Sequence, residues 1–265
     1  RRRTMATAVA LQPQSLGTRY YARVLAQETR YEFLKMMRAK VFSFSVIGFP
    51  VMFYMIFGLT NHHVEYARYL LASYSCFGMF GAALFGLGAG VSMERAQGWL
   101  ELKQASPMPR FAYLFAKTAT CAAIAMITVA ILLALGLTMG GVTMTMLEVV
   151  KLAAITLAGA IPFAAMGLLI SFVLPPNAGP GMINIIYLPM SFASGMWMPI
   201  DSLPHWIQKL ALTLPTYHYV QLALNIFGYA QPGTAMAPHW EALIGFSCLL
   251  VGAAWLVITR SEAKA

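Results

Sequence analysis

Three neighbouring side chains, Asp201, Ser202 and His205, carry the residue types of an acid, a nucleophile and a base. Such a set can cleave an ester or amide bond when the base lies within hydrogen-bond reach of the nucleophile. Closeness in sequence does not provide that geometry, and the same residues are typical of a turn that begins a helix. The sequence also contains no GxSxG, HExxH or GxxxxGK[ST] motif. ATP hydrolysis by this chain alone is therefore not expected.

The residues that could bind metal are scattered. The histidines are His62, His63, His205, His218 and His239. A metal site needs defined ligand spacing and supporting carboxylates, and these positions offer neither. The three cysteines, Cys76, Cys121 and Cys248, lie inside apolar runs and are interpreted as small buried hydrophobic residues. We predict no metal and no cofactor bound by this chain.

The segment 94–111 is the third candidate. It begins with the charged pair Glu94 and Arg95, continues through Gly98, Trp99 and Glu101, and ends at a proline pair, Pro107 and Pro109. Prolines stop helices, so a short charged helix is expected before the next apolar run begins. Such a helix at a membrane face would suit the docking of a partner, although a plain solvated loop would have the same composition.

The elements that position these residues are long apolar runs. Hydrophobic residues make up 59% of the 265 residues and charged residues only 10%, too little polar surface for a water-soluble protein of this size. A helix of about 20 apolar residues crosses about 30 Å of hydrocarbon. We predict an all-α integral membrane protein with about six transmembrane helices, near 41–60, 69–93, 112–139, 150–174, 178–199 and 239–259.

These spans form a single transmembrane domain, 41–259, and further segments flank it or join its spans. Residues 1–17 are expected to be a flexible N-terminus, 18–40 an interfacial amphipathic helix, 199–238 an outer re-entrant-like hairpin and 260–265 a short tail. Gly78, Ala82, Gly86 and Gly90 recur at four-residue steps and predict close helix packing.

The distribution of basic residues predicts the orientation. With both termini in the cytoplasm, all but three of the basic side chains lie inside, and only Arg68, Lys151 and Lys209 lie outside. The basic residues on the inner side include Lys35, Lys103 and Lys117. The net charge of +9 then reflects topology and anionic lipid headgroups, not nucleic acid.

The segment from Glu94 onward resembles the cytoplasmic signature of the ABC type 2 transporter permeases, the family of drug, polysaccharide and lipo-oligosaccharide exporters. The residues that carry the resemblance are Glu94, Arg95, Gly98, Trp99, Leu100, Glu101, Ser106 and Pro107. Trp99 stands where the family commonly has threonine. The outer segment is similar to the family's hairpin through Pro199, Asp201, Pro204 and Pro215.

The resemblance implies a permease subunit in the bacterial cytoplasmic (inner) membrane that exports an amphipathic or apolar compound. It implies two ABC ATP-binding subunits, with ATP and Mg bound there, and a second permease copy, most simply in a homodimer. In that picture the helix 18–40 and the signature segment contact the ATPases. Candidate residues along the substrate pathway are Phe80, Phe85, Asn184, Tyr187, Phe192 and Met196.

Three alternatives stay open. A secondary transporter or channel would need a titratable group near the middle of the membrane, and the predicted spans offer none there. A membrane-embedded enzyme would use the outer histidines and Asp201. A permease-like scaffold that recruits an ATPase for signalling or assembly, without moving a substrate, is not excluded by the sequence.

Overall fold

The computed structural model describes residues 18–60, 63–99, 102, 110–175, 180–231, 233 and 235–262. Within these ranges the chain is helical and has no strand, as the apolar runs predict. The predicted N-terminus 1–17 and the residues 263–265 of the predicted tail lie outside the described residues. So do four residues of the signature segment, Leu100, Glu101, Ser106 and Pro107.

Four helical segments are long and apolar enough to cross a membrane: Val64–Ala96, Phe111–Thr138, Met146–Val173 and Met236–Val257. They coincide with the predicted spans at 69–93, 112–139, 150–174 and 239–259. The other two predicted spans, 41–60 and 178–199, correspond to the shorter apolar helices Phe44–Leu59 and Gly181–Ala193. The structure thus confirms an all-helical chain, four of whose helical segments are long and apolar enough to cross a membrane.

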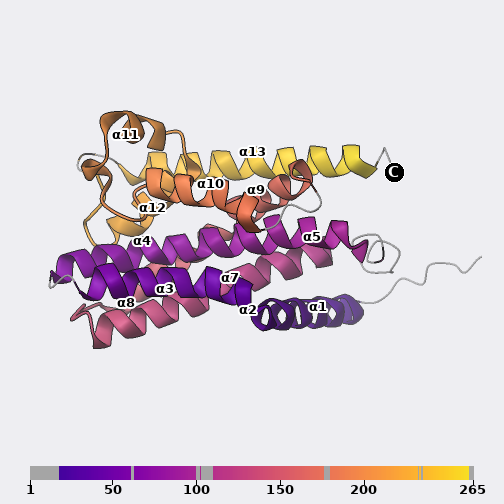
Figure 1. The fold of residues 1–265 in the computed structure, drawn as a ribbon, viewed down its shortest axis with the longest axis horizontal. Coiled ribbons are helices and arrows are strands. Elements are labelled where there is room, and N and C mark those ends of the chain that lie inside the picture. The colour runs from indigo at the N-terminus through magenta and orange to yellow at the C-terminus, as the bar shows by residue number, and fades with distance from the viewer. Residues whose placement is uncertain are drawn as a thin grey trace, which may run out of the picture.

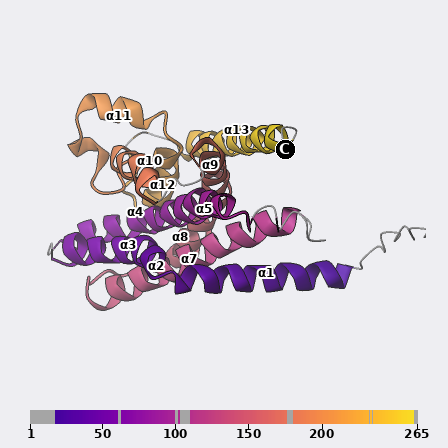
Figure 2. The same ribbon diagram turned by 45° about the vertical axis from the view of Figure 1, so that its right-hand side comes forward.

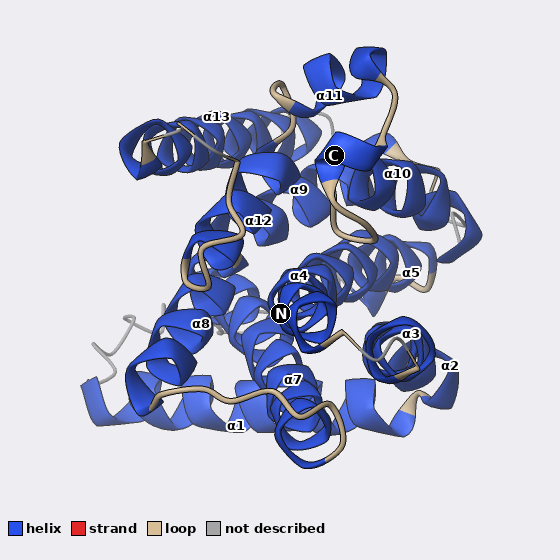
Figure 3. Cartoon of the chain, turned by 90° about the vertical axis from the view of Figure 1, so that its left-hand side faces the viewer, coloured by secondary structure: helices blue, strands red, loops and turns tan. Residues whose placement is uncertain are grey.

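The first part of the chain forms a helix that lies across the bundle. Helix α1 (Thr18–Arg38) is followed by α2 (Lys40–Ser43), η1 (Phe44–Gly48), α3 (Phe49–Phe53) and η2 (Tyr54–Leu59). In Figure 3, where α3 and α4 are seen end-on, α1 runs across the page. This direction suits the predicted interfacial helix.

The second span is the central element. It consists of α4 (Val64–Ala83), the π-helical turn η3 (Leu84–Ala89) and α5 (Gly90–Ala96). It packs along α7 (Arg110–Thr138). A Cβ on Gly78 would lie 3.0 Å from Thr128, and one on Gly86 would lie 2.6 Å from the Cys121 sulfur. The predicted packing face is therefore confirmed at these glycines.

The next span bends in the middle. It comprises α8 (Met146–Ala158) and α9 (Ala160–Val173), which meet at Gly159. Pro162 lies in the first turn of α9 and has no N–H for the helical ladder. At the bend the Tyr219 hydroxyl donates to the Thr156 carbonyl at 2.9 Å. A Cβ on Gly159 would lie 2.6 Å from the Tyr219 ring.

The last third contains α10 (Pro180–Ala193), η4 (Ile200–Ser202), α11 (His205–Ala211), α12 (Pro215–Asn225) and α13 (Met236–Glu262). Figures 1 and 2 show α11 at one end of the bundle, and α1, α5 and the last turn of α13 at the other. We call these the hairpin end and the α1 end. Helix α12 is not an exposed loop: it is buried against α4, α8 and α13.

The cysteines only partly match their prediction. Cys76 and Cys121 are buried, whereas Cys248 is exposed. The difference arises because α13 lies at the edge of the bundle, where only 11% of its apolar window is covered by the rest of the chain. None of the three forms a disulfide.

Candidate functional site

A cluster of charged side chains lies at the α1 end, where three helices meet. Helix α1 contributes Glu32 and Lys35, α5 contributes Glu94, and α7 contributes Tyr113 and Lys117. Residues three or four apart share one face of a helix. The spacings of 32 to 35 and 113 to 117 therefore turn both members of each pair toward α5. We call these five residues the charge cluster.

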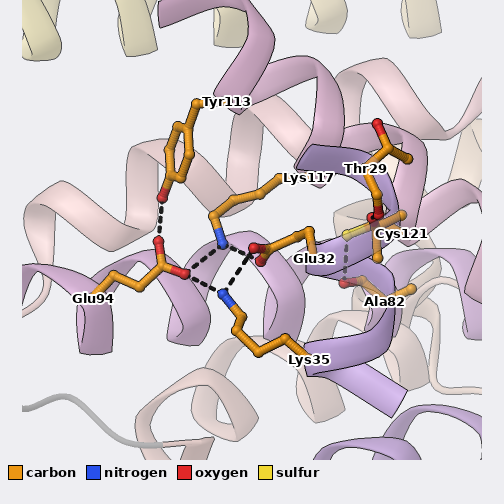
Figure 4. Close-up of polar contacts among 9 residues, drawn as sticks. Thr29, Glu32, Lys35, Ala82, Glu94, Tyr113, Lys117 and Cys121 are labelled. Atoms are coloured by element: carbon orange, nitrogen blue, oxygen red, sulfur yellow. Dashed lines mark hydrogen bonds and ion pairs between the residues drawn. The ribbon is translucent and has the colours of Figure 1, made fainter. Parts of the chain in front are cut away.

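The contacts in the charge cluster are continuous (Figure 4). The Lys117 ammonium lies 2.5 Å from a Glu32 oxygen and 3.0 Å from a Glu94 oxygen. The Lys35 ammonium pairs with the same two carboxylates, at 2.8 Å from Glu32. The Tyr113 hydroxyl donates to the second Glu94 oxygen at 2.5 Å. Each carboxylate is thus shared by both ammonium groups.

Most of the charge cluster is buried, so its ion pairs compensate charges that are removed from solvent. The side chains of Lys117 and Glu32 are 1% and 4% exposed, and that of Glu94 is 11% exposed. Burying a charge costs free energy unless a partner compensates it, and here two carboxylates face two ammonium groups. Lys35 is different because 53% of its side chain is exposed. It forms the outer wall of an otherwise buried, electrically balanced cluster.

The pKa values of the two α1 residues reflect this environment. Burial acts to raise the pKa of the Glu32 carboxyl, but Lys117 and Lys35 outweigh it and hold that pKa below its ordinary value. Burial acts to lower the pKa of Lys35, but Glu94 and Glu32 outweigh it and raise that pKa. Both residues therefore stay charged at neutral pH, and the ion pairs persist.

The residue after Glu94 points to a different helix. The Arg95 guanidinium donates to the Ser171 carbonyl at 2.6 Å and lies 4.8 Å from the centre of the Phe172 ring. Both partners belong to the last turn of α9, where a cation is favourable because helical carbonyls are unsatisfied there. The Ser92 hydroxyl donates to the Pro175 carbonyl just beyond that helix, at 3.1 Å. Helix α5 therefore holds α1 and α7 through Glu94 and α9 through Arg95.

This arrangement can transmit motion more readily than it can catalyse. Every polar end of the charge cluster is engaged in ion pairs or hydrogen bonds, so no group is poised to attack a substrate. Among the described residues, no group of three or more histidine, cysteine or acidic side chains could hold a metal. A rigid junction of three helix ends is an element through which a displacement of one helix moves the others.

Comparison with known proteins decides the family. Residues 24–227 match the model of the ABC-2 type transporter family. The chain belongs to this family. It is also 27% identical over 201 residues to the Bacillus subtilis (strain 168) protein named "Putative transport permease YvfS", covering 74% of this chain and 82% of that protein. The resemblance found in the signature segment is thus confirmed, and with it the assignment to the transport permeases.

Within this ABC-2 permease the predicted docking residues divide into two groups. Glu94 and Arg95 are engaged inside the chain, as described above. Gly98 has a φ of +71°, a value that favours glycine, and it turns the chain away from α5. Trp99 follows that turn and is 52% exposed. Of the predicted docking set, Trp99 is therefore the described side chain available to a partner.

The predicted pathway residues of the permease lie mainly in its packed core. Phe80, Phe85 and Tyr187 are buried, and both phenylalanine rings lie 5.3 Å from the Tyr187 ring. Met196 is also buried, whereas Asn184 and Phe192 are half-buried. In the single chain the aromatic residues hold α4 and η3 against α10, and their role as pathway residues stays a prediction.

The hairpin residues begin helices and do not form a triad. Pro199 and Pro204 are the N-caps of η4 and α11, and Pro215 is the first residue of α12. Asp201 accepts a hydrogen bond from the Gln231 amide at 2.8 Å. The Ser202 hydroxyl donates to the Pro199 carbonyl at 2.6 Å. Ser202 is therefore engaged in a turn, as the alternative interpretation of this segment has it.

Sequence reasoning missed Glu32 and did not give Lys117 a site role. Lys117 was assigned only to the basic residues of the inner side. Its position seven residues into an apolar helix was a usable signal, because a buried lysine requires a carboxylate partner. Glu32 could not be chosen as that partner from sequence, since the contact joins residues 85 positions apart.

Proposed function

We propose that this chain is the transmembrane permease subunit of an ATP-driven ABC exporter. It moves an amphipathic or apolar compound, such as a drug, lipid or glycolipid, out of the cytoplasm or inner leaflet. Membership of the ABC-2 family supports transport. The sequence has no phosphate loop, which favours a separate ATP-binding subunit as the source of energy.

The observation that carries the proposal is the junction of helix ends at the α1 end. Glu94 binds both ammonium groups of the charge cluster, and Arg95 binds the end of α9. A partner that displaces α5 therefore displaces α1, α7 and α9 with it. Coupling requires contacts that differ between two states, and a rigid junction conveys such a difference to the spans.

The exposed side chains near this junction supply a surface for that partner. Trp99 is 52% exposed and Leu102 is 65% exposed, and both lie in the segment that follows α5. Large apolar residues next to a charged helix end are typical of protein contact sites. In this proposal the ATPase contacts Trp99 and Leu102, while Glu94 and Arg95 connect the contact to the bundle.

The rest of the assembly follows from the same proposal. Two ATP-binding subunits hold ATP and Mg, and the permease forms a homodimer in a bacterial inner membrane. Its six spans comprise the four long helices together with α2 to η2 and α10. The α1 end, with both termini, faces the cytoplasm, and α11 and α12 form the outer hairpin. This orientation agrees with the excess of basic residues at the α1 end.

The experiment compares two exposed tryptophans at opposite ends of the chain. Trp99→Ser and Trp206→Ser are each co-expressed with the native ATP-binding subunit, and stimulation of ATPase activity is measured in reconstituted vesicles. Trp206 is 68% exposed on α11, so it is a matched control. We expect Trp99→Ser to reduce stimulation about tenfold or more, as for a central interface tryptophan. Trp206→Ser should leave it unchanged.

Two results would contradict this function. Full stimulation in Trp99→Ser would remove the docking surface proposed at the end of α5. Substrate flux driven by a proton gradient, by the chain alone and without nucleotide, would favour the secondary transporter instead.

A further inference from the structure

Two histidines from different helices meet at the hairpin end of the chain. His218 lies on α12 and His239 lies in the first turn of α13. Their Nδ1 atoms are 2.9 Å apart, and the centres of their imidazole rings are 5.1 Å apart. The two residues are 21 positions apart in the sequence, so the contact arises from the packing of α12 on α13. We call them the histidine pair.

A hydrogen bond fixes which nitrogen of His218 is free. Its Nε2 lies 3.0 Å from the carbonyl oxygen of Leu212, the residue that caps the end of α11. A carbonyl can only accept, so Nε2 carries the hydrogen, and in the neutral ring the Nδ1 lone pair is directed at His239. Histidines that bind a metal through one nitrogen usually donate from the other in this way, and a backbone carbonyl is one of the usual acceptors.

The two Nδ1 atoms are as close together as two ligands of one metal ion. Imidazole nitrogens bind Zn²⁺ at about 2.0–2.1 Å, so two of them at angles of about 90 to 109° are about 2.8–3.4 Å apart. The observed separation of 2.9 Å lies in this range. In the metal-free pair the His239 Nδ1 hydrogen fills the gap. When a metal binds, that hydrogen moves to Nε2 of the same ring, and both Nδ1 lone pairs face the ion.

The surroundings hold the rings in place and determine the type of ion. The Tyr217 ring lies 5.4 Å from the His218 ring and 5.8 Å from the His239 ring. His239 is 4% exposed, whereas His218 is half-buried, so an ion between them keeps access to water. Among the described residues, no carboxylate is hydrogen-bonded or ion-paired to either imidazole. Neutral imidazoles suit Cu²⁺, Zn²⁺ and Ni²⁺, whereas Mg²⁺ and Ca²⁺ require oxygen ligands.

We propose that the histidine pair binds a divalent transition-metal ion, Cu²⁺ or Zn²⁺, through its two Nδ1 atoms, with water at the remaining positions. The ion joins α12 to α13 and, through the Leu212 carbonyl, stabilises the end of α11. This site departs from the sequence-based prediction of no bound metal, because local spacing does not bring residues 218 and 239 together. It does not depend on the proposed exporter function, since both ligands belong to the single chain.

The test measures Cu²⁺ binding to the full, untagged chain in phosphatidylcholine nanodiscs by isothermal titration calorimetry. Binding to chain-free nanodiscs is subtracted. We expect one Cu²⁺ site per chain and no comparable binding of Mg²⁺. His218→Gln and His239→Gln should each weaken Cu²⁺ binding about tenfold or more, because each removes one of two ligands. His205→Gln changes an exposed histidine on α11, at the same end, and should alter binding by less than about twofold.

Two further measurements distinguish lost coordination from a damaged fold. The electron paramagnetic resonance spectrum of bound Cu²⁺ should show coupling to two directly bound nitrogens, and this signature should be lost in His218→Gln. Zn²⁺ at about a hundredfold excess over its Kd should raise the midpoint of thermal unfolding by about 5 °C in the native chain and in His205→Gln. The same Zn²⁺ concentration should not raise the midpoint of His239→Gln.

The outcomes that would overturn the site are specific. Cu²⁺ binding that survives in a chain with both His218→Gln and His239→Gln belongs to other residues. Binding that occurs only at millimolar Cu²⁺ is that of an adventitious ion only. Equal losses in His205→Gln and in the pair variants would also exclude the site. Each of these failures leaves the exporter proposal intact, because ATPase stimulation through Trp99 does not involve the histidine pair.

Discussion

At the scale of single residues, Lys117 is a buried charge that depends on its ion pairs for stability. It is fully buried and neutralises two carboxylates at once. Lys117→Met keeps the length of the side chain but leaves Lys35 as the one ammonium group that pairs with Glu32 and Glu94 among the described residues. Removing one partner of a buried ion pair costs about 3–5 kcal/mol. We expect a loss of this size in thermal unfolding of the detergent-solubilised chain.

Two further variants separate lost charge from lost packing in that experiment. Lys151→Met changes an exposed lysine on α8 and should leave the midpoint of thermal unfolding unchanged. Glu32→Gln added to Lys117→Met removes the unpaired charge and should restore part of the stability. A double variant less stable than Lys117→Met alone would contradict the electrostatic explanation.

The attachment of α1 should also depend on pH. The pKa of Glu32 is below its ordinary value of 4.5. Its contribution to the stability of the α1 attachment is therefore present above pH 4.5 and is lost as pH falls through the lowered value. The pKa of Lys35 is above its ordinary value of 10.5. Its contribution to the stability of the α1 attachment is therefore present below pH 10.5 and is lost as pH rises through the raised value. Hydrogen exchange of the α1 amides should therefore be slowest between about pH 5 and 10, after correction for the intrinsic rate.

The acid side of that profile has a specific control. In Glu32→Gln the protective carboxylate is absent at every pH, so the acid-dependent loss of α1 protection should shrink. An unchanged acid limb in this variant would assign the effect to other groups.

At the scale of the elements, close contact between α9 and the second span depends on Gly167. A Cβ there would lie 2.7 Å from the Ala83 carbonyl oxygen, a backbone atom that cannot move aside like a flexible side chain. We expect Gly167→Ala to destabilise the chain by about 2 kcal/mol or more, a cost typical of overpacking. Gly245→Ala on exposed α13 meets no atom within 4 Å and should be neutral or slightly stabilising. Equal unfolding midpoints for both variants would contradict the close packing.

The sequence predicts elements better than it predicts their partners. The long spans follow from apolar length alone, and Gly78 and Gly86 predict a close helix contact because small residues permit one. The charged composition of segment 94–111 and the resemblance to the permease family placed Glu94 on a docking surface. The structure instead buries Glu94, because α1 and α7 each bring an ammonium group to it. That contact depends on how three helices pack, which a local pattern does not contain.

The bend between α8 and α9 shows the same limit. Pro162 marks a possible interruption in the sequence, as does Gly159 beside it. The contact that uses the bend, between Tyr219 and the Thr156 carbonyl, joins α12 to α8 across 63 positions. Neither Tyr219 nor Thr156 lies in a sequence pattern that predicts this contact.

At the scale of the whole molecule, the two shorter apolar helices, Phe44–Leu59 and Gly181–Ala193, determine which side of the membrane each end faces. Helix α10 has 14 residues, which is about 21 Å of rise and short of the roughly 30 Å hydrocarbon core. The segment after α10 leads through η4 into the hairpin and completes the crossing if six spans are right. Three spans, α7, α8 with α9, and α10, then separate Gln97 from Lys209, so these exposed residues must lie on opposite sides. Without α10 as a span they would lie on the same side.

Cysteine labelling decides between these topologies. In a Cys248→Ala background, since Cys248 is exposed and the other two cysteines are buried, single cysteines replace Arg23, Gln97 or Lys209 in chains expressed without a partner in whole cells. A membrane-impermeant maleimide should label Lys209→Cys directly, and Arg23→Cys and Gln97→Cys only after permeabilisation. Labelling of Arg23→Cys and Gln97→Cys on opposite sides would remove α2 to η2 as a span, because two spans must separate them. If Gln97→Cys and Lys209→Cys shared a side, α10 would be a half-membrane helix, and the hairpin and the ATPase-docking surface could not occupy opposite faces as an exporter requires.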